Sequence, residues 1–190
     1  DLLVKMVNED AEDETSSHDF GTDILPKMIH DTQVFAYDFS TNRIPGELPG
    51  REAYWRDVGT IDAFYEANMD IRSHDPALNL YNRQWPLRTA SYATPPVKFE
   101  YTDEGRQGVA IDSMVSSGCI ISGSRVQDSI LGRNVVVQDG ALIEDSVIFD
   151  SCTIGRNSKI RRAIIENNIN LPEETIIGHD AESDRQKYVV

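Results

Sequence analysis

The chain has 190 residues, of which 32 are acidic and 18 are basic, so its formal charge is −14. This acidic excess argues against a nucleic-acid-binding protein, because such proteins neutralise phosphates with clustered Lys and Arg. No apolar stretch is long enough to span a membrane, and the two cysteines lack a CxxC spacing, so we expect a cytoplasmic protein with reduced thiols.

The first elements are helical. Residues 2–10 read as a helix, and because the sequence starts within it we expect the chain to be part of a longer protein. The acidic run of residues 9–14 is predicted to be a solvated helix end. A polar loop over residues 15–21 precedes a short helix that carries Pro26 in its first turn. Residues 33–39 alternate in the manner of a strand.

The middle of the chain mixes loops with short elements. Residues 40–52 contain two Pro and two Gly and are predicted to form a loop. A strand is predicted over residues 54–58, and Thr60 is predicted to cap a helix with Ile61, Phe64, Tyr65 and Asn68-Met69 on its buried face. Residues 75–96 contain four prolines and read as an irregular wrapping segment before a strand at 97–101.

An internal repeat occupies the last part of the chain. Aliphatic residues recur every five or six positions, and three successive steps span 17 residues. The repeating positions are Ile120, Val126, Leu131, Val137, Ile143, Ile148, Ile154, Ile160, Ile165, Leu171 and Ile177. Because this period fits neither a helix nor a flat strand, it predicts a triangular coil of short strands with one aliphatic per side pointing inward. Gly132, Gly155, Gly178, Asn134 and Asn157 fall where corners need residues that tolerate positive φ.

The segment before the predicted helix is chemically dense. Residues 54–60 read Tyr-Trp-Arg-Asp-Val-Gly-Thr, which places the Asp57 carboxylate between a predicted strand and a helix start. Such a carboxylate can hold a divalent metal or a ligand hydroxyl. The plainer alternative is a helix cap or an Arg partner.

Four segments resemble one known family. They are residues 17–27 (Ser-His-Asp-Phe-Gly-Thr-Asp-Ile-Leu-Pro-Lys), residues 54–60, residues 85–89 (Trp-Pro-Leu-Arg-Thr) and residues 116–123 (Ser-Ser-Gly-Cys-Ile-Ile-Ser-Gly). In this order, with the repeat, they resemble bacterial glucose-1-phosphate adenylyltransferase. The resemblance implies an α/β plus all-β chain, in which the end of a Rossmann-like nucleotidyltransferase domain (1–86) and a linker (87–108) precede a left-handed parallel β-helix of hexapeptide repeats (109–190).

The resemblance also implies the chemistry. The family transfers the adenylyl group of ATP to glucose 1-phosphate with Mg²⁺ for glycogen synthesis, which implies that Asp57 is the catalytic, metal-associated carboxylate. Asp19, Phe20 and Trp55 are then expected to line the glucose-1-phosphate pocket, although plain core packing is the alternative for the two aromatic rings. The family forms homotetramers, so the same is expected here.

Two features depart from the family. Its Gly-rich phosphate loop and the Lys that binds the sugar phosphate belong to the amino-terminal half and are not in these residues, so we expect the chain alone to be inactive. Arg156, Lys159, Arg161 and Arg162 form a basic cluster that could bind a sugar-phosphate or nucleotide effector. The alternative is pairing with Glu144, Asp145 or Glu166, and Asn167 stands where activator-regulated relatives can carry Arg.

Other functions remain open at this point. The same domain plan occurs in enzymes making GDP-mannose or UDP-N-acetylglucosamine and in non-catalytic regulatory paralogues. Hexapeptide-repeat acyltransferases use a corner His, and within the coils here no His precedes His179. A solenoid taken alone is also compatible with a spacer or an oligomerisation device.

Overall fold

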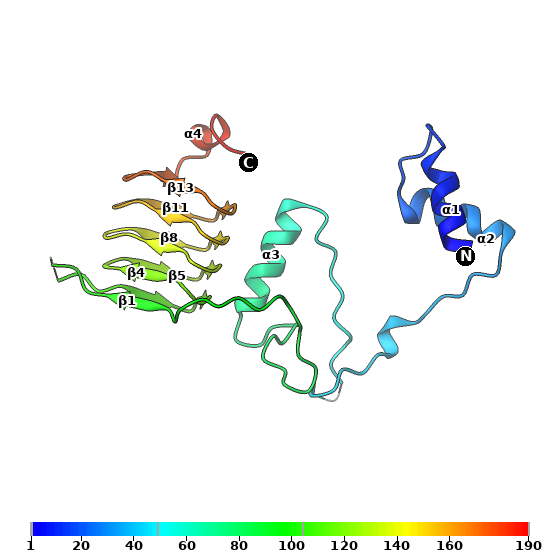
Figure 1. The fold of residues 1–190 in the computed structure, drawn as a ribbon, viewed down its shortest axis with the longest axis horizontal. Helices are drawn as coiled ribbons and strands as arrows, with labels where there is room; N and C mark the ends of the chain where they lie inside the picture. Colours follow the sequence, from blue (N-terminus) through cyan, green and yellow to red (C-terminus); the bar gives the residue numbers. More distant parts are fainter. Residues whose placement is uncertain (1, 49, 104, 190) are drawn as a thin grey trace. The chain divides into compact units, whose positions relative to one another are not determined.

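The computed structural model describes residues 2–48, 50–103 and 105–189. The chain divides into two compact units, Asp1–Arg43 and Ile44–Val190 (Figure 1).

The first unit is helical. The predicted helices are confirmed as α1 (Leu2–Ala11) and α2 (Leu25–Asp31), and a π-helical turn, η1 (Phe20–Ile24), leads into α2. Pro26 lies in the first turn of α2, where its missing N–H costs no hydrogen bond. The acidic run is not uniformly solvated, because Asp10 is only 4% exposed.

The strands predicted over residues 33–39 and 54–58 are wrong, whereas the one predicted over 97–101 is confirmed as β1 (Lys98–Glu100). Residues 33–38 have no regular structure and lead into the 3₁₀ turn η2 (Phe39–Thr41), and residues 54–58 are unpaired. Phe35 and Tyr37 are 85% and 73% exposed. An alternating sequence becomes a strand only where another strand accepts its backbone hydrogen bonds, and the described residues supply none.

The helix predicted after Thr60 is α3 (Ile61–Arg72). The Thr60 hydroxyl accepts a hydrogen bond from the Ala63 amide at 3.1 Å, so the predicted cap is confirmed. The predicted buried face is partly wrong, because Ile61 is 64% exposed and Ala67 is the buried residue of this helix.

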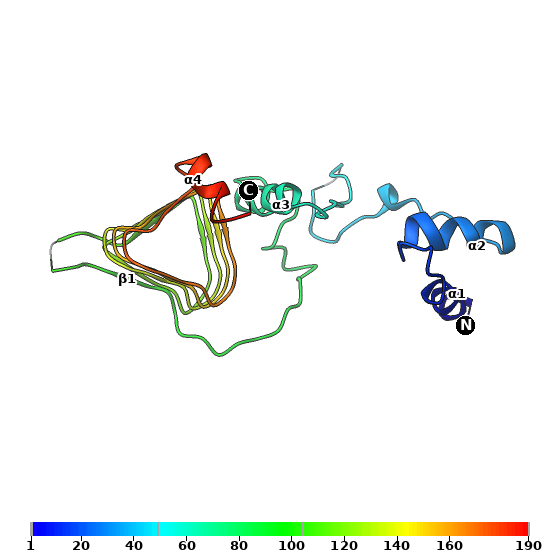
Figure 2. The ribbon, with the colours of Figure 1, turned by 90° about the horizontal axis from the view of Figure 1, so that it is seen from above.

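The rest of the second unit is a parallel β-solenoid with a triangular cross-section (Figure 2). One sheet contains β1 (Lys98–Glu100), β4 (Ile120–Ser122), β7 (Val136–Val137), β10 (Thr153–Ile154) and β13 (Asn170–Leu171). A second contains β2 (Val109–Ile111), β5 (Arg125–Gln127), β8 (Leu142–Glu144), β11 (Lys159–Arg161) and β14 (Ile176–Ile177). The third contains β3 (Met114–Val115), β6 (Ile130–Leu131), β9 (Val147–Ile148) and β12 (Ile164–Ile165).

The solenoid core confirms the repeat with one correction. Nine of the eleven predicted aliphatics are buried in the core and Leu171 is partly buried against it, but in the first full coil the inward residue is Ile121, not Ile120. Ile121 lies beside Val137 in the β4–β7 register and is fully buried. Gly123 has a φ of 49° and lies in the corner between β4 and β5. This corner has one residue fewer than the equivalent corner between β7 and β8, so the inward position in β4 is shifted by one residue.

The corner residues have two different roles. Asn134, Asn157 and Gly178 have the positive φ that their positions predicted. Gly132 and Gly155 do not, and are needed for close approach instead. A Cβ on Gly155 would lie 2.5 Å from the backbone nitrogen of Glu173 on the next coil.

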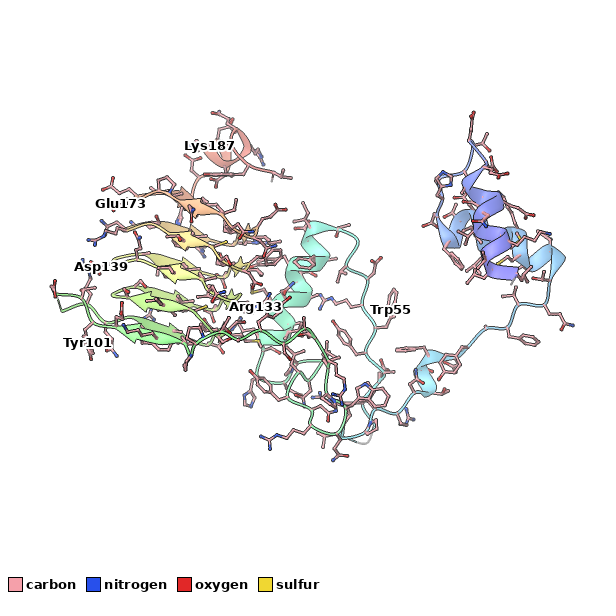
Figure 3. The ribbon with its side chains drawn as sticks, in the orientation of Figure 1. Trp55, Tyr101, Arg133, Asp139, Glu173 and Lys187 are labelled. Carbon is pink, nitrogen blue, oxygen red and sulfur yellow. The ribbon has the colours of Figure 1, made fainter. Side chains whose placement is uncertain are left out.

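The irregular segment 75–96 runs to the solenoid, as predicted. Arg133 stacks on the ring of Tyr92, with the guanidinium carbon 3.4 Å from the ring centroid (Figure 3). The carbonyl of Pro95 accepts a hydrogen bond from Gly118 at 2.7 Å. Strand β1 lies within the predicted linker 87–108 and pairs with β4, so the solenoid sheet already includes these residues. After the last coil, α4 (Ala181–Arg185) follows, and its buried Asp184 accepts a hydrogen bond from the Gly178 amide at 2.9 Å.

A ladder of buried serines joins successive coils. The Ser129 hydroxyl accepts a hydrogen bond from the Ser146 amide at 3.1 Å, and the Ser146 hydroxyl accepts one from the Ala163 amide at 3.2 Å. Ser146 also donates to the carbonyl of Glu144 at 2.6 Å. Each hydroxyl therefore satisfies buried backbone groups of two coils.

Replacing Ser146 by Ala should lower the free energy of unfolding by about 1–3 kcal/mol, because the partly buried Ala163 amide loses its hydrogen-bond acceptor. Urea unfolding followed by circular dichroism measures the change. Ser116→Ala removes an exposed hydroxyl and is the control. Equal effects of the two substitutions would contradict the role given to the ladder.

Candidate functional site

A buried carboxylate organises the loop that precedes the first candidate site. Asp10 accepts a hydrogen bond from the Ser16 hydroxyl at 2.8 Å and lies 3.1 Å from Nδ1 of His18. The Lys27 ammonium lies 3.5 Å from Oδ1 of Asp10, the oxygen that accepts the Ser16 hydrogen bond, and 3.0 Å from Asp13. The Ser16 hydrogen bond is the main cause that holds the pKa of Asp10 below its ordinary value. The end of α1, the loop and α2 are therefore joined by one polar network.

Asp19 and Phe20 follow directly in this loop. Asp19 caps η1, since its Oδ1 accepts a hydrogen bond from the Thr22 amide at 2.6 Å, and this bond is the main cause that lowers its pKa. Asp23 accepts a hydrogen bond from the Asp19 amide at 3.1 Å. Asp19 is thus an exposed, ionised acceptor, and Phe20 beside it has a ring that is 44% exposed. His18 is held at φ of 59°, a backbone conformation that non-glycine residues adopt mainly where neighbouring contacts hold them.

Asp13 provides a direct test of this charged network. Its carboxylate accepts hydrogen bonds from the Thr15 hydroxyl and the Lys27 ammonium, which lower its pKa from 3.8 to about 2. A lowered pKa contributes stability that is present above about pH 4 and is lost as the pH falls towards 2. An NMR titration of the Asp13 carboxyl should therefore show a midpoint near 2, and Thr15→Ala should raise it. A wild-type midpoint near 3.8 would show that these contacts do not form in solution.

Trp55 and Asp57 lie on the extended segment before α3. The Trp55 side chain is 75% exposed and points away from the solenoid (Figure 3). Asp57 is also exposed, and its Oδ1 accepts a hydrogen bond from the Gly59 amide at 2.8 Å. Its second oxygen has no hydrogen-bond partner among residues 2–48, 50–103 and 105–189. The segment therefore presents a rigidly turned carboxylate and an accessible indole.

The loop before this segment is held in place by hydrogen bonds. Asn82 is 8% exposed, donates to the carbonyl of Pro45 at 2.8 Å and accepts hydrogen bonds from the amides of Gln84 and Trp85. Arg51 donates to the carbonyl of Pro76 at 3.0 Å. These contacts join the turn around Gly46 to the segment that carries Trp85.

The basic cluster lies around β11. Lys159 and Arg161 are exposed on that strand, and Arg162 and Asn157 have positive φ at the corners on either side of it. Nε of Arg156 lies 3.9 Å from a carboxylate oxygen of Glu173 on the next coil. In the register of β8 and β11, Arg161 lies beside Glu144. A predicted effector site at these residues stays a prediction.

The four predicted substrate and metal residues form two pairs. Asp19 and Phe20 are neighbours in the unit Asp1–Arg43, and Trp55 and Asp57 are neighbours in the unit Ile44–Val190. Each pair combines an exposed carboxylate with an exposed aromatic ring. Neither Phe20 nor Trp55 packs into a core formed by the described residues, since both are exposed. Acceptors beside aromatic faces suit a sugar, which offers hydroxyl donors and an apolar C–H face.

Sequence reasoning missed three residues that organise these segments: Asp10, Asn82 and Arg72. Asp10 stands in an acidic run, Asn82 in a proline-rich segment and Arg72 in the last turn of a helix, all settings in which polar residues are usually solvated. Only the spacing of Asp10 from Ser16 and His18 could have indicated a local network.

Two further properties of the described residues concern metal binding and membranes. No cluster of three or more His, Cys, Asp or Glu side chains in residues 2–48, 50–103 and 105–189 could hold a metal ion by itself. Among the same residues, no helix has the length and apolarity needed to cross a membrane.

The stacked coils define the chain as a hexapeptide-repeat β-solenoid protein. The chain belongs to the GlmU-like, C-terminal hexapeptide family, whose model matches residues 95–190. The model of the nucleotidyl transferase family matches residues 1–74. The predicted order of a nucleotidyltransferase part and a hexapeptide part is confirmed.

Curated relatives confirm the resemblance drawn from the motifs. The glucose-1-phosphate adenylyltransferase of Anaeromyxobacter sp. (strain Fw109-5) is 46% identical over 192 residues, covering 100% of this chain and 47% of the relative. That of Koribacter versatilis is 44% identical and covers 100% of the chain and 44% of the relative. That of Geobacter metallireducens is 48% identical over 170 residues, covering 89% of the chain and 41% of the relative. The chain therefore spans about half the length of the relatives it matches.

Proposed function

We propose that the chain supplies the sugar-phosphate-binding residues and the solenoid of a glucose-1-phosphate adenylyltransferase. The observation that carries the proposal is the similarity over the whole chain to relatives of that name at 44–46% identity. In the reaction, a phosphate oxygen of glucose 1-phosphate forms a bond to the α-phosphorus of ATP. The bond from that phosphorus to the bridging oxygen breaks, and pyrophosphate leaves with the electron pair.

The exposed side chains fit the sugar phosphate. Asp19 would accept hydrogen bonds from sugar hydroxyls, because its carboxylate is ionised and oriented by the Thr22 amide. The exposed rings of Phe20 and Trp55 would each offer an apolar face to a pyranose. The network around Asp10 would hold the first of these loops in place before substrate binds.

Asp57 fits one ligand position of a magnesium ion. Mg²⁺ is held in nucleotide sites by one or two carboxylates together with water and substrate phosphates, and Asp57 offers one oxygen with no hydrogen-bond partner among the described residues. A bound Mg²⁺ would supply positive charge to the phosphates of the transition state. The role of Asp57 is to present that oxygen at a fixed position before α3.

Regulation and assembly are part of the proposal. Arg156, Lys159, Arg161 and Arg162 would bind the phosphate of an effector, such as fructose 1,6-bisphosphate or fructose 6-phosphate, and the chain would act in a cytoplasmic homotetramer. Thermal stabilisation by these sugar phosphates, abolished in Arg161→Ala, is the expected result for the effector. No shift with either compound would remove the effector site. Light scattering of the complete enzyme would test the tetramer.

A chimera and a substrate panel test the proposed function. In the chimera, this chain replaces the matched segment of the Anaeromyxobacter relative. Pyrophosphate release should be fastest with ATP and glucose 1-phosphate, and slower with UTP and N-acetylglucosamine 1-phosphate or with GTP and mannose 1-phosphate. A preference for either alternative pair would assign the chain to another sugar-nucleotide pyrophosphorylase. The chain alone should release no pyrophosphate.

A further inference from the structure

Helix α3 is fastened to the solenoid corners by polar contacts from its last residue, Arg72, and from Tyr65 in its first half. The Arg72 guanidinium nitrogen Nη1 donates to the carbonyl and to the carboxylate of Asp112, at 3.0 and 2.8 Å. The same nitrogen donates to the carboxylate of Asp128 on the next coil, at 3.1 Å. The Tyr65 hydroxyl donates to the carbonyl of Asp145, one coil further, at 2.7 Å.

These three aspartates occupy equivalent corners. Asp112, Asp128 and Asp145 have φ of 44°, 50° and 45°, and each directly follows a strand of the second sheet and begins the turn to the third sheet. A left-handed corner turns its backbone carbonyl and side chain outward, where a helix lying along the solenoid axis can meet one coil after another (Figure 1). Helix α3 therefore contacts three successive coils with two side chains.

The contact is partly buried. The Arg72 side chain is 17% exposed, and its Nε is buried without a hydrogen-bond partner among the described residues. Next to Tyr65, the ring of Phe64 packs edge-on against Phe149, which directly follows β9, with ring centroids 6.0 Å apart. The Asp112 side chain is 67% exposed and that of Asp128 is 30% exposed, so solvent screens the pair with Asp112 more than the pair with Asp128.

Helix α3 begins at Ile61, three residues beyond Val58, the residue that follows Asp57. The Asp57 carboxylate bonds to the Gly59 amide, and Thr60 caps the first turn, so only a short, hydrogen-bonded turn separates the carboxylate from α3. A helix transmits a displacement along its length because its backbone hydrogen bonds keep it rigid. A shift of the solenoid corners would therefore move the start of α3 and, with it, Asp57.

We infer that Arg72 and Tyr65 are positioning residues that fasten α3 to the solenoid corners and so hold Asp57 in place. The inference rests on the proposed function for what Asp57 does, but the fastening itself is independent of it. According to this inference, α3 is the element that transmits a displacement of the solenoid corners to Asp57 in the nucleotidyltransferase part.

Hydrogen–deuterium exchange of the whole chain tests the fastening without any assay of activity. In Arg72→Ala, the hydrogen-bonded amides of Gly59 and of residues 63–72 should exchange at least about tenfold faster, whereas those of β5 and β8 should not change. Tyr65→Phe keeps the ring and removes one hydrogen bond, and should act in the same direction even if Arg72→Ala does not fold. Arg125→Ala is the control, because Arg125 bonds to Gln127 on the outer face of β5.

The chimera then tests the consequence for catalysis. Both variants should lower kcat about fivefold or more and raise the Mg²⁺ concentration needed for half-maximal rate, with the KM for glucose 1-phosphate unchanged. Faster exchange only at residues 70–73, with Gly59 as in wild type, would overturn the inference, since Arg72 would then hold the helix end alone. An inactive wild-type chimera would instead refute the proposed function, while the exchange result would still decide the fastening.

Discussion

Replacing Asp57 by Asn in the chimera is expected to lower kcat by about 10²- to 10³-fold, the usual loss when one group that stabilises transition-state charge is removed. The physical reason is that a neutral amide binds Mg²⁺ far less well than a carboxylate. The turn should survive, because the amide oxygen of Asn can still accept the hydrogen bond that Oδ1 of Asp57 accepts from the Gly59 amide. Initial rates of pyrophosphate release at saturating ATP, glucose 1-phosphate and Mg²⁺ measure the change.

The matched control for this prediction is Asp62→Asn. Asp62 is an exposed carboxylate in the first turn of the same helix, so its substitution removes the same charge a few residues away. The control should retain its rate within about twofold, and both variants should keep the melting temperature of the unsubstituted protein. If Asp57→Asn lost less than about threefold in rate, the carboxylate would be a cap and not a metal-associated group.

The largest effect on stability is expected from Ile143→Ala. Ile143 is fully buried and lies between Val126 and Ile160 on the neighbouring coils. Removing a buried aliphatic side chain leaves a cavity that the stacked strands cannot close, so the free energy of unfolding should fall by about 2–5 kcal/mol. Urea unfolding followed by far-ultraviolet circular dichroism measures it.

Leu142 provides the matched control, because it precedes Ile143 in β8 and faces the opposite side of the sheet, where it is only half-buried. Leu142→Ala should therefore cost less than half as much as Ile143→Ala. If the two substitutions cost the same, the inward and outward faces assigned to β8 would be reversed or the coil would not be stacked.

The solenoid could be predicted because its signal is local and repeated. Each inward aliphatic occurs five or six residues after the last, so ten positions were found without any structure. The repeat predicted Ile120 instead of Ile121 because the two isoleucines are adjacent in the sequence. Only the short corner at Gly123 determines which of them points inward. When two adjacent aliphatic residues both fit a spacing of five or six, the spacing alone cannot show that a corner is one residue shorter.

The residues before the solenoid were harder to predict. Residues 33–39 and 54–58 alternate as strands do, but a strand also needs a partner for its backbone, and alternation carries no information about that partner. The substrate residues came from a family resemblance, since an exposed Asp beside an exposed ring is common on any surface.

The contacts that organise the candidate site are mostly long-range. Arg72 meets Asp112 and Asp128, which are 40 and 56 residues away. In the sequence it looks like an ordinary cation in the last turn of a helix, where it would complement the helix dipole. Asp10 is nearer its partners, but the choice of which carboxylate in an acidic run is buried depends on where His18, Ser16 and Lys27 converge.

The central claim is that this chain can serve as the sugar-phosphate and solenoid part of a glucose-1-phosphate adenylyltransferase. The most direct test compares pyrophosphate release from ATP and glucose 1-phosphate by the chimera, by the Anaeromyxobacter relative lacking the matched segment, and by this chain alone. The claim predicts ready turnover by the chimera and none by the two separate parts. A chimera that folds, as judged by circular dichroism, but releases no pyrophosphate would contradict it.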